Sequence, residues 1–75
     1  MGILPVISGQ QAIKALNKIG YEIHHQTGSH IILRQGIAPF RRLTIPSHKE
    51  LKKGTLRAII RQAGLTVDEF NNLLK

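Results

Sequence analysis

Hydrophobic residues recur at helical spacing in the stretch between Ser8 and Gly20. Ser8 is a residue type that caps helix N-termini, and Gly20 stands where a helix commonly ends. The apolar positions between them share one face of such a helix: Ala12, Ile13, Leu16 and Ile19. The pattern predicts an amphipathic first helix.

The pattern then changes to the alternation of β-strands over residues 21–26 and 30–35, with a turn at Thr27-Gly28-Ser29. A three-residue loop at 27–29 places Ile23 opposite Leu33. Glu22 then lies opposite Arg34, His24 opposite Ile32 and Gln26 opposite His30. One face is then mainly apolar and predicted to point inward: Tyr21, Ile23, His25, Ile31 and Leu33. The other face is predicted to be open to solvent: Glu22, His24, Gln26, His30, Ile32 and Arg34.

A two-residue Gly-Ser turn is the alternative for this hairpin. It would pair Ile23 with Arg34 and mix charge into the core, because a slip of one residue exchanges the two faces of a strand. We therefore adopt the three-residue loop.

The rest of the chain predicts one more strand and two more helices. After a connection at 36–40, residues 41–45 form a strand with Leu43 and Ile45 inward and Arg42 and Thr44 outward, ended by Pro46. A helix begins near residues 53–55 and ends at Gly64, with an apolar stripe at Leu56, Ile59, Ile60 and Ala63. A capping box formed by Thr66 and Glu69 starts a short last helix that runs to Leu74.

The order α-β-β-β-α-α predicts an α+β fold, in which a three-stranded antiparallel sheet carries helices on one face. Residues 1–75 make a single domain, since a chain of this size buries only about 60% of its unfolded surface in one small core.

The net charge of the chain indicates its function more directly than its hydrophobic content does. Eleven Lys and Arg stand against four Asp and Glu, which gives a net charge of +7. Such an excess attracts polyanions, and nucleic acid is the commonest of them, so we favour it over solubility alone. The chain has no cysteine, no apolar run near the roughly 20 residues of a membrane span, and no signal peptide in its first six residues. We therefore expect a cytoplasmic protein without a membrane partner.

Basic residues gather where the second long helix begins. Lys49, Lys52 and Lys53 precede or open this helix, although cations usually stabilise the opposite end. A helix N-terminus binds anions, and here the amides of Gly54 and Thr55 would contribute. Arg57 and Arg61 continue from Lys53 at a spacing of four. We interpret the cluster as a phosphate site, the alternative being a solvated charge run.

Histidines supply the candidate chemistry. His30 lies on the predicted open face, where an imidazole could take a proton from the 2′-hydroxyl of RNA, although a lone strand histidine is more often structural. His24 shares that face and could assist, and His48, in the loop before the lysines, could contact a phosphate. His25 is expected to be packed inward. Because adjacent strand residues point to opposite faces, His24 and His25 are not expected to chelate together, and we reject a metal site.

The chain resembles the HicA (YcfA-like) toxins over nearly its whole length. The matching segments are Leu4-Pro5-x-x-Ser8-Gly9, Leu16-x-x-x-Gly20-Tyr21-Glu22, Gly28-Ser29-His30, Ile45-Pro46-x-His48, and Leu51-x-Lys53-Gly54-Thr55-Leu56-Arg57-x-Ile59-x-Arg61-x-Ala63-Gly64-Leu65. The resemblance implies a double-stranded-RNA-binding-domain-like fold. It also implies a toxin of a type II toxin–antitoxin system, a metal-free and cofactor-free endoribonuclease that cleaves messenger RNA and is neutralised by a HicB-like antitoxin.

The catalytic histidine of similar proteins falls on His30 in this sequence. The residues expected to contact RNA are Lys49, Lys52, Lys53, Gly54, Thr55, Arg57, Arg61, Arg34, Arg42, His24 and Ser29, with the two strand arginines steadying charge on the transferring phosphoryl group. Two alternatives stay open. One is a non-catalytic module that binds double-stranded RNA by shape. The other is a purely protein-binding partner of an acidic antitoxin.

Overall fold

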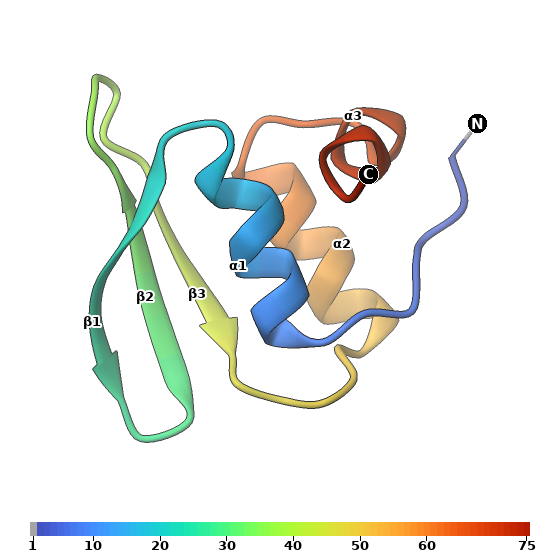
Figure 1. Cartoon of the computed structure of the whole chain (residues 1–75), viewed down its shortest axis with the longest axis horizontal. Helices are drawn as coiled ribbons and strands as arrows, with labels where there is room; N and C mark the ends of the chain where they lie inside the picture. The colour runs from blue at the N-terminus through green and yellow to red at the C-terminus, as the bar shows by residue number, and fades with distance from the viewer. Residues whose placement is uncertain (1) are drawn as a thin grey trace.

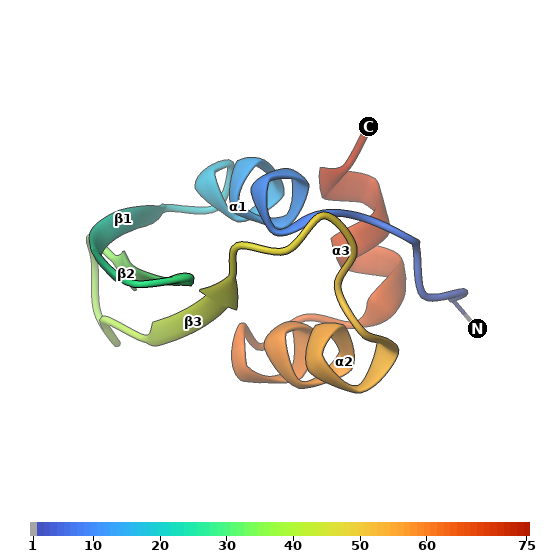
Figure 2. The same ribbon diagram turned by 90° about the horizontal axis from the view of Figure 1, so that it is seen from below.

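A computed structural model describes residues 2–75. These residues form a three-stranded antiparallel sheet, in the order β1-β2-β3, and three helices. The elements in chain order are α1 (Gly9–Asn17), β1 (Tyr21–Thr27), β2 (His30–Gln35), β3 (Arg42–Pro46), α2 (Lys53–Gln62) and α3 (Val67–Leu73). Helices α1 and α2 lie on the same side of the sheet, and no helix of the described residues covers the other side (Figures 1 and 2). The predicted α+β fold and its element order are confirmed.

The first helix starts at a reciprocal capping box. The Ser8 hydroxyl accepts a hydrogen bond from the Gln11 amide at 3.1 Å, and the Gln11 side chain accepts one from the Ser8 amide at 2.9 Å. The helix is followed by Gly20 with a φ of 96°, a left-handed conformation that suits glycine. The predicted start and end signals are therefore both confirmed.

The core lies between the helices and the covered face of the sheet. Its largest fully buried side chains come from every element: Leu16, Tyr21, Leu33, Leu43, Ile45, Leu56 and Phe70. The apolar stripe predicted for α2 is buried in full, and Thr66 and Glu69 form the predicted capping box of α3. None of the helices within residues 2–75 is long and apolar enough to cross a membrane.

The register of the β1–β2 hairpin departs from the prediction. Thr27 pairs with His30, so the turn has two residues, Gly28 and Ser29, and Gly28 takes a φ of 58°. Closer to the start of β1, Ile23 pairs with Leu33 as predicted. Both pairings hold because a β-bulge at His24 inserts one extra residue between Ile23 and His25. The predicted pairs of His24 with Ile32 and of Gln26 with His30 are wrong.

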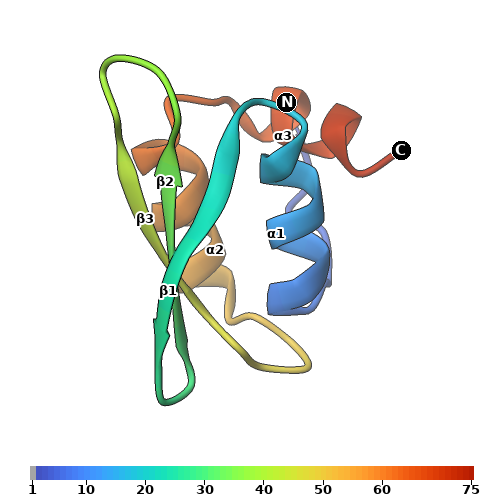
Figure 3. The same ribbon diagram turned by 60° about the vertical axis from the view of Figure 1, so that its left-hand side comes forward.

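The bulge also changes which side chains share a face. His25 pairs with Ile32, an outward position of β2, and is exposed instead of packed inward as predicted. Gln26 now pairs with the buried Ile31 and takes the helix side, but it stays exposed because the hairpin extends past the helices at its turn (Figure 3). Ile23 is on the predicted side, yet on the edge strand β1 it remains 56% exposed and does not join the core.

Candidate functional site

The uncovered face of the sheet, called here the open face, is rich in cationic and titratable side chains. Strand alternation on β2 and β3 buries Ile31, Leu33, Leu43 and Ile45, so the residues between them point the other way. Cross-strand pairing then extends the open face to β1. Its members are Glu22, His24, His25, Thr27, His30, Ile32, Arg34, Arg42 and Thr44.

His30 occupies the end of this face nearest the hairpin turn. It is exposed, it is the first residue of β2, and it lies between Thr27 of β1 and Pro46 of β3. The neighbouring amide of Ser47 donates to the carbonyl of Ser29 at 2.6 Å. This bond ties the turn to the segment that carries His48 and leads to the lysines of α2.

The two long helices begin at the same end of the molecule as the Gly28-Ser29 turn (Figure 1). The start of α1 is fixed there by a hydrogen bond of 2.9 Å from the Gly9 amide to the His48 carbonyl. Helix N-termini carry partial positive charge and free amide groups. Both helices therefore point their positive ends toward the end of the molecule that carries this turn.

Three lysines flank the N-terminus of α2, and Glu50 is the one acidic residue among positions 49–55. Its N-cap is Lys52, which makes no side-chain capping bond within residues 2–75, and its first turn contains no acidic residue. Lys49, Lys52, Lys53 and Gly54 are all exposed, and Thr55 is half-buried. The structure thus places the predicted cluster at an accessible helix start, next to the segment tied to Ser29.

The predicted arginines fall into two groups. Arg34 and Arg42 face each other across β2 and β3 on the open face, and Glu22 lies on the other side of Arg34. Like charges directly opposite each other destabilise a sheet, and a bound anion would offset this cost. Arg57 and Arg61 are exposed on α2, in line with Lys53, and lie away from the open face.

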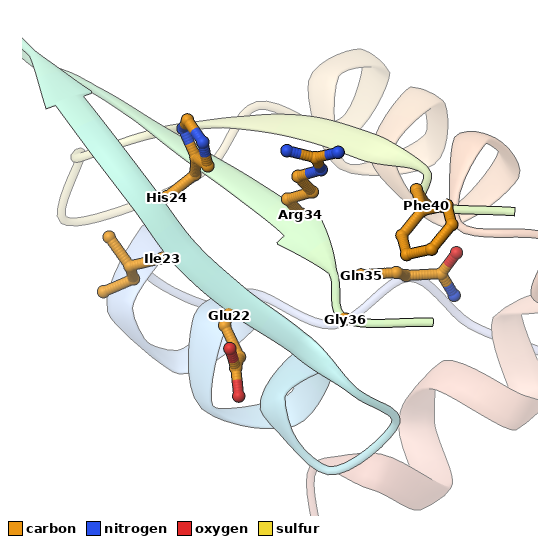
Figure 4. A pocket seen from close by; sticks show the side chains of 7 residues that line it. All are labelled: Glu22, Ile23, His24, Arg34, Gln35, Gly36 and Phe40. Carbon is orange, nitrogen blue, oxygen red and sulfur yellow. The ribbon is translucent and has the colours of Figure 1, made fainter. Parts of the chain in front are cut away.

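A small pocket of about 250 Å³ opens near the other end of the open face (Figure 4). It is lined by Glu22, Ile23, His24, Arg34, Gln35, Gly36 and Phe40. The Arg34 guanidinium carbon lies 5.8 Å from the centre of the Phe40 ring, within the range of a cation–π contact. Sequence analysis did not single out Phe40, whose only signal was a large aromatic residue in a connection next to Pro39.

His24 and His25 form a pair at the bulge. Their Nδ1 atoms lie 2.7 Å apart, and the rings meet edge to face at 72°. One ring must donate and the other accept, because each neutral imidazole carries one N–H. The expectation that these neighbours point to opposite faces is wrong, since the bulge interrupts the alternation on which it depended. Within residues 2–75, no group of three or more side chains is arranged to hold a metal ion.

Comparison with known proteins gives one family. A family model described as the HicA toxin of bacterial toxin–antitoxin systems matches residues 9–65 of the 75-residue chain. The matched region runs from the start of α1 past the end of α2 and includes the whole sheet, His30 and the lysine cluster. No curated protein matches the chain.

Proposed function

The chain belongs to the HicA toxin family of bacterial toxin–antitoxin systems, and we propose from this premise that it is a metal-independent endoribonuclease that cleaves messenger RNA in the cytoplasm. As a toxin of this family it has a cognate antitoxin as partner. We propose that this antitoxin is HicB-like and that His30 is the catalytic residue.

The observation that carries the proposal is the position of His30. It is exposed on the open face at the turn end of β2, and the turn is hydrogen-bonded through Ser29 to Ser47, in the segment that leads to the lysines of α2. We propose that this exposed imidazole and the lysines of that segment supply the two elements that RNA cleavage needs, a group that exchanges protons and a cationic surface that holds the backbone.

In the proposed reaction, His30 takes the proton of a 2′-hydroxyl and the 2′-oxygen attacks the adjacent phosphorus. The bond from phosphorus to the 5′-oxygen breaks, which leaves a 2′,3′-cyclic phosphate and a 5′-hydroxyl. DNA lacks the 2′-hydroxyl, so this chemistry restricts the substrate to RNA. Arg34 and Arg42 would stabilise the charge on the phosphoryl oxygens.

The remaining contacts hold the RNA in place. We propose that Lys49, Lys52 and Lys53 neutralise phosphates at the start of α2, assisted by the amides of Gly54 and Thr55. Arg57 and Arg61 extend this surface along α2, whereas Ser29 and His24 contact the strand that crosses the open face. The antitoxin would then inhibit by covering the open face.

The test compares wild-type protein with the His30→Ala variant. Because His30 is exposed, the substitution leaves folding intact, and we expect it to abolish growth arrest and to leave cellular messenger RNA whole. Gln10→Ala, which alters an exposed residue of α1 outside the proposed RNA surface, serves as the control and should behave as wild type. Cleavage by His30→Ala at the wild-type rate would contradict the assignment. Salt-sensitive duplex binding by wild type without RNA turnover would favour the non-catalytic module instead.

A further inference from the structure

We propose that His25 is a second catalytic residue, which donates a proton to the 5′-oxygen as it leaves, and that His24 holds His25 in place. The proposal rests on the RNA cleavage proposed above. It concerns the protonation of the leaving group, a step for which His30 alone provides no donor once it acts as the base.

The bulge is what brings His25 to the right surface. In an uninterrupted strand with the predicted register, His25 would point toward the helices. With His24 inserted as the extra residue, His25 pairs with Ile32 and Thr27 with His30, so all four side chains stand on the open face. His25 and His30 are thereby diagonal neighbours on two adjacent strands.

The spacing of such diagonal neighbours suits two groups that act on one phosphate. Their Cα atoms lie about 7–8 Å apart, a separation that long side chains can bridge. The attacking 2′-oxygen and the leaving 5′-oxygen occupy opposite sides of the phosphorus in an in-line displacement. An acid and a base each need to reach within about 2.6–3.2 Å of their own oxygen. Imidazoles on both sides of a phosphate meet this requirement, and His30 next to the 2′-oxygen leaves the 5′-oxygen to His25.

His24 fixes the orientation of the His25 ring and accepts a hydrogen bond from its protonated form. The 2.7 Å contact between the Nδ1 atoms lets the His25 imidazolium donate its Nδ1–H to His24, so its Nε2–H remains free for the leaving group. The charged and titratable side chains that share the open face with this pair include Glu22 of β1, Arg34 of β2 and, at the turn end, His30. His24 therefore acts through His25 as a positioning residue.

The step balances without a further reactant. His30 removes the proton from the 2′-oxygen, the bond from that oxygen to phosphorus forms, and the bond from phosphorus to the 5′-oxygen breaks. The electron pair of the broken bond stays on the 5′-oxygen, which takes the proton of the His25 imidazolium. His25 ends neutral and His30 ends protonated, and exchange with solvent restores both.

A substrate whose leaving group needs no proton tests the role of His25. The probe is an oligoribonucleotide in which the 5′-bridging oxygen at the cleaved position is replaced by sulfur, because a thiolate departs without general acid assistance. On the ordinary oligoribonucleotide, we expect His25→Ala to lower the cleavage rate about 10²–10⁴-fold, the usual contribution of a general acid. On the sulfur substrate, His25→Ala should cleave within about tenfold of wild type, since the lost contribution is no longer needed.

The companion variants separate this role from others. His30→Ala should lose activity on both substrates, and His24→Ala should show a smaller loss that sulfur also relieves, whereas Gln10→Ala should match wild type on both. Wild-type cleavage of ordinary RNA by His25→Ala, or equal losses on the two substrates, overturns the role of His25 and leaves His30 and the proposed function standing. If wild-type protein cleaves neither substrate, the proposed function itself fails and the role of His25 fails with it.

Discussion

At the scale of single residues, packing explains why the motif Leu4-Pro5-x-x-Ser8-Gly9 ends in a glycine. The Cβ of any other residue at this position would overlap the carbonyl oxygen of Pro46, which is backbone and cannot turn aside. Its amide also donates to the His48 carbonyl at 2.9 Å. Gly9 thus lets the start of α1 approach the segment that leaves β3 and leads through His48 to the lysines of α2.

Gly9→Ala should therefore destabilise the protein. Forcing a methyl group against backbone in a packed site typically costs about 1–3 kcal/mol, and we expect a loss of this size in the free energy of unfolding measured with urea. Gly54→Ala is the matched control, since no atom beyond its chain neighbours and the backbone of its own helix lies within 4 Å of a Cβ there, and alanine favours a helix over glycine by up to about 1 kcal/mol. A stability of Gly9→Ala equal to that of the parent would contradict the packing argument.

The burial of Tyr21 predicts how the stability of the fold changes with pH. Its side chain is fully buried, and its hydroxyl has no hydrogen-bond partner among residues 2–75. Burial raises the pKa of Tyr21 above its ordinary value of 10.0, and the charge of Arg41 opposes this only in part. The unfolded chain therefore ionises first, so the folded state loses stability as pH rises above about 10 toward the raised pKa.

Tyr21→Phe should remove this part of the loss of folding stability at alkaline pH. At neutral pH the variant should be as stable as the parent or more stable by about 1 kcal/mol, because it no longer buries an unpaired hydroxyl. Thermal unfolding of both proteins between neutral pH and pH above 10 measures the difference. A loss of stability at neutral pH would show that the hydroxyl is hydrogen-bonded after all.

At the scale of elements, the three helices differ in how they begin. Helices α1 and α3 each start with a reciprocal capping box, at Ser8 and Thr66, whereas α2 starts at Lys52 without a side-chain capping bond among the residues described. Local stability would favour an acidic or hydroxyl residue at Lys52. A start that is poor for the helix and good for an anion is typical of a functional site.

Lys52→Asp should consequently raise stability and lower RNA affinity together. We expect about 0.5–2 kcal/mol of added unfolding free energy from the cap and the charge, measured by urea titration. RNA binding, measured with the same variant in the His30→Ala background to prevent cleavage, should weaken. Lys52→Ser separates the effects, because it supplies the cap without a negative charge. Unchanged affinity in both variants would remove Lys52 from the RNA surface.

The hairpin shows where sequence patterns stop being sufficient. Apolar periodicity and capping residues predicted all six elements, since helical stripes depend on neighbours three or four positions away and strands on alternation at every second residue. The same alternation demanded a three-residue loop, because Ile23 had to face Leu33, while Gly28 is well suited to a two-residue turn. Only an extra residue at His24 allows both the Ile23–Leu33 pair and the two-residue turn. No local sequence pattern predicts such a bulge. His30 was therefore placed on the open face by sequence, whereas His25 and Phe40 were not identified.

At the scale of the whole molecule, charge and helix direction act together. The net charge of +7 attracts polyanions, such as the proposed RNA substrate, from any direction, but α1 and α2 both point their positive ends toward the end of the molecule that carries the Gly28-Ser29 turn. The exposed lysines at the start of α2 add to this end. The long-range field therefore favours encounter, and local contacts at this end decide where the backbone is held.

The dependence of RNA affinity on salt distinguishes these two contributions. If Lys49, Lys52, Lys53, Arg57 and Arg61 each neutralise one phosphate, the logarithm of the binding constant of His30→Ala for single-stranded RNA should fall against the logarithm of salt concentration with a slope of about −3.5. Lys53→Ala should reduce the slope by about 0.7. Lys14→Ala removes the same charge from α1, where we place no phosphate, and should leave the slope unchanged. Equal slopes for the two variants would mean that charge acts only through the general field. Negligible RNA affinity beside tight binding of the antitoxin would instead assign the basic surface to that protein partner.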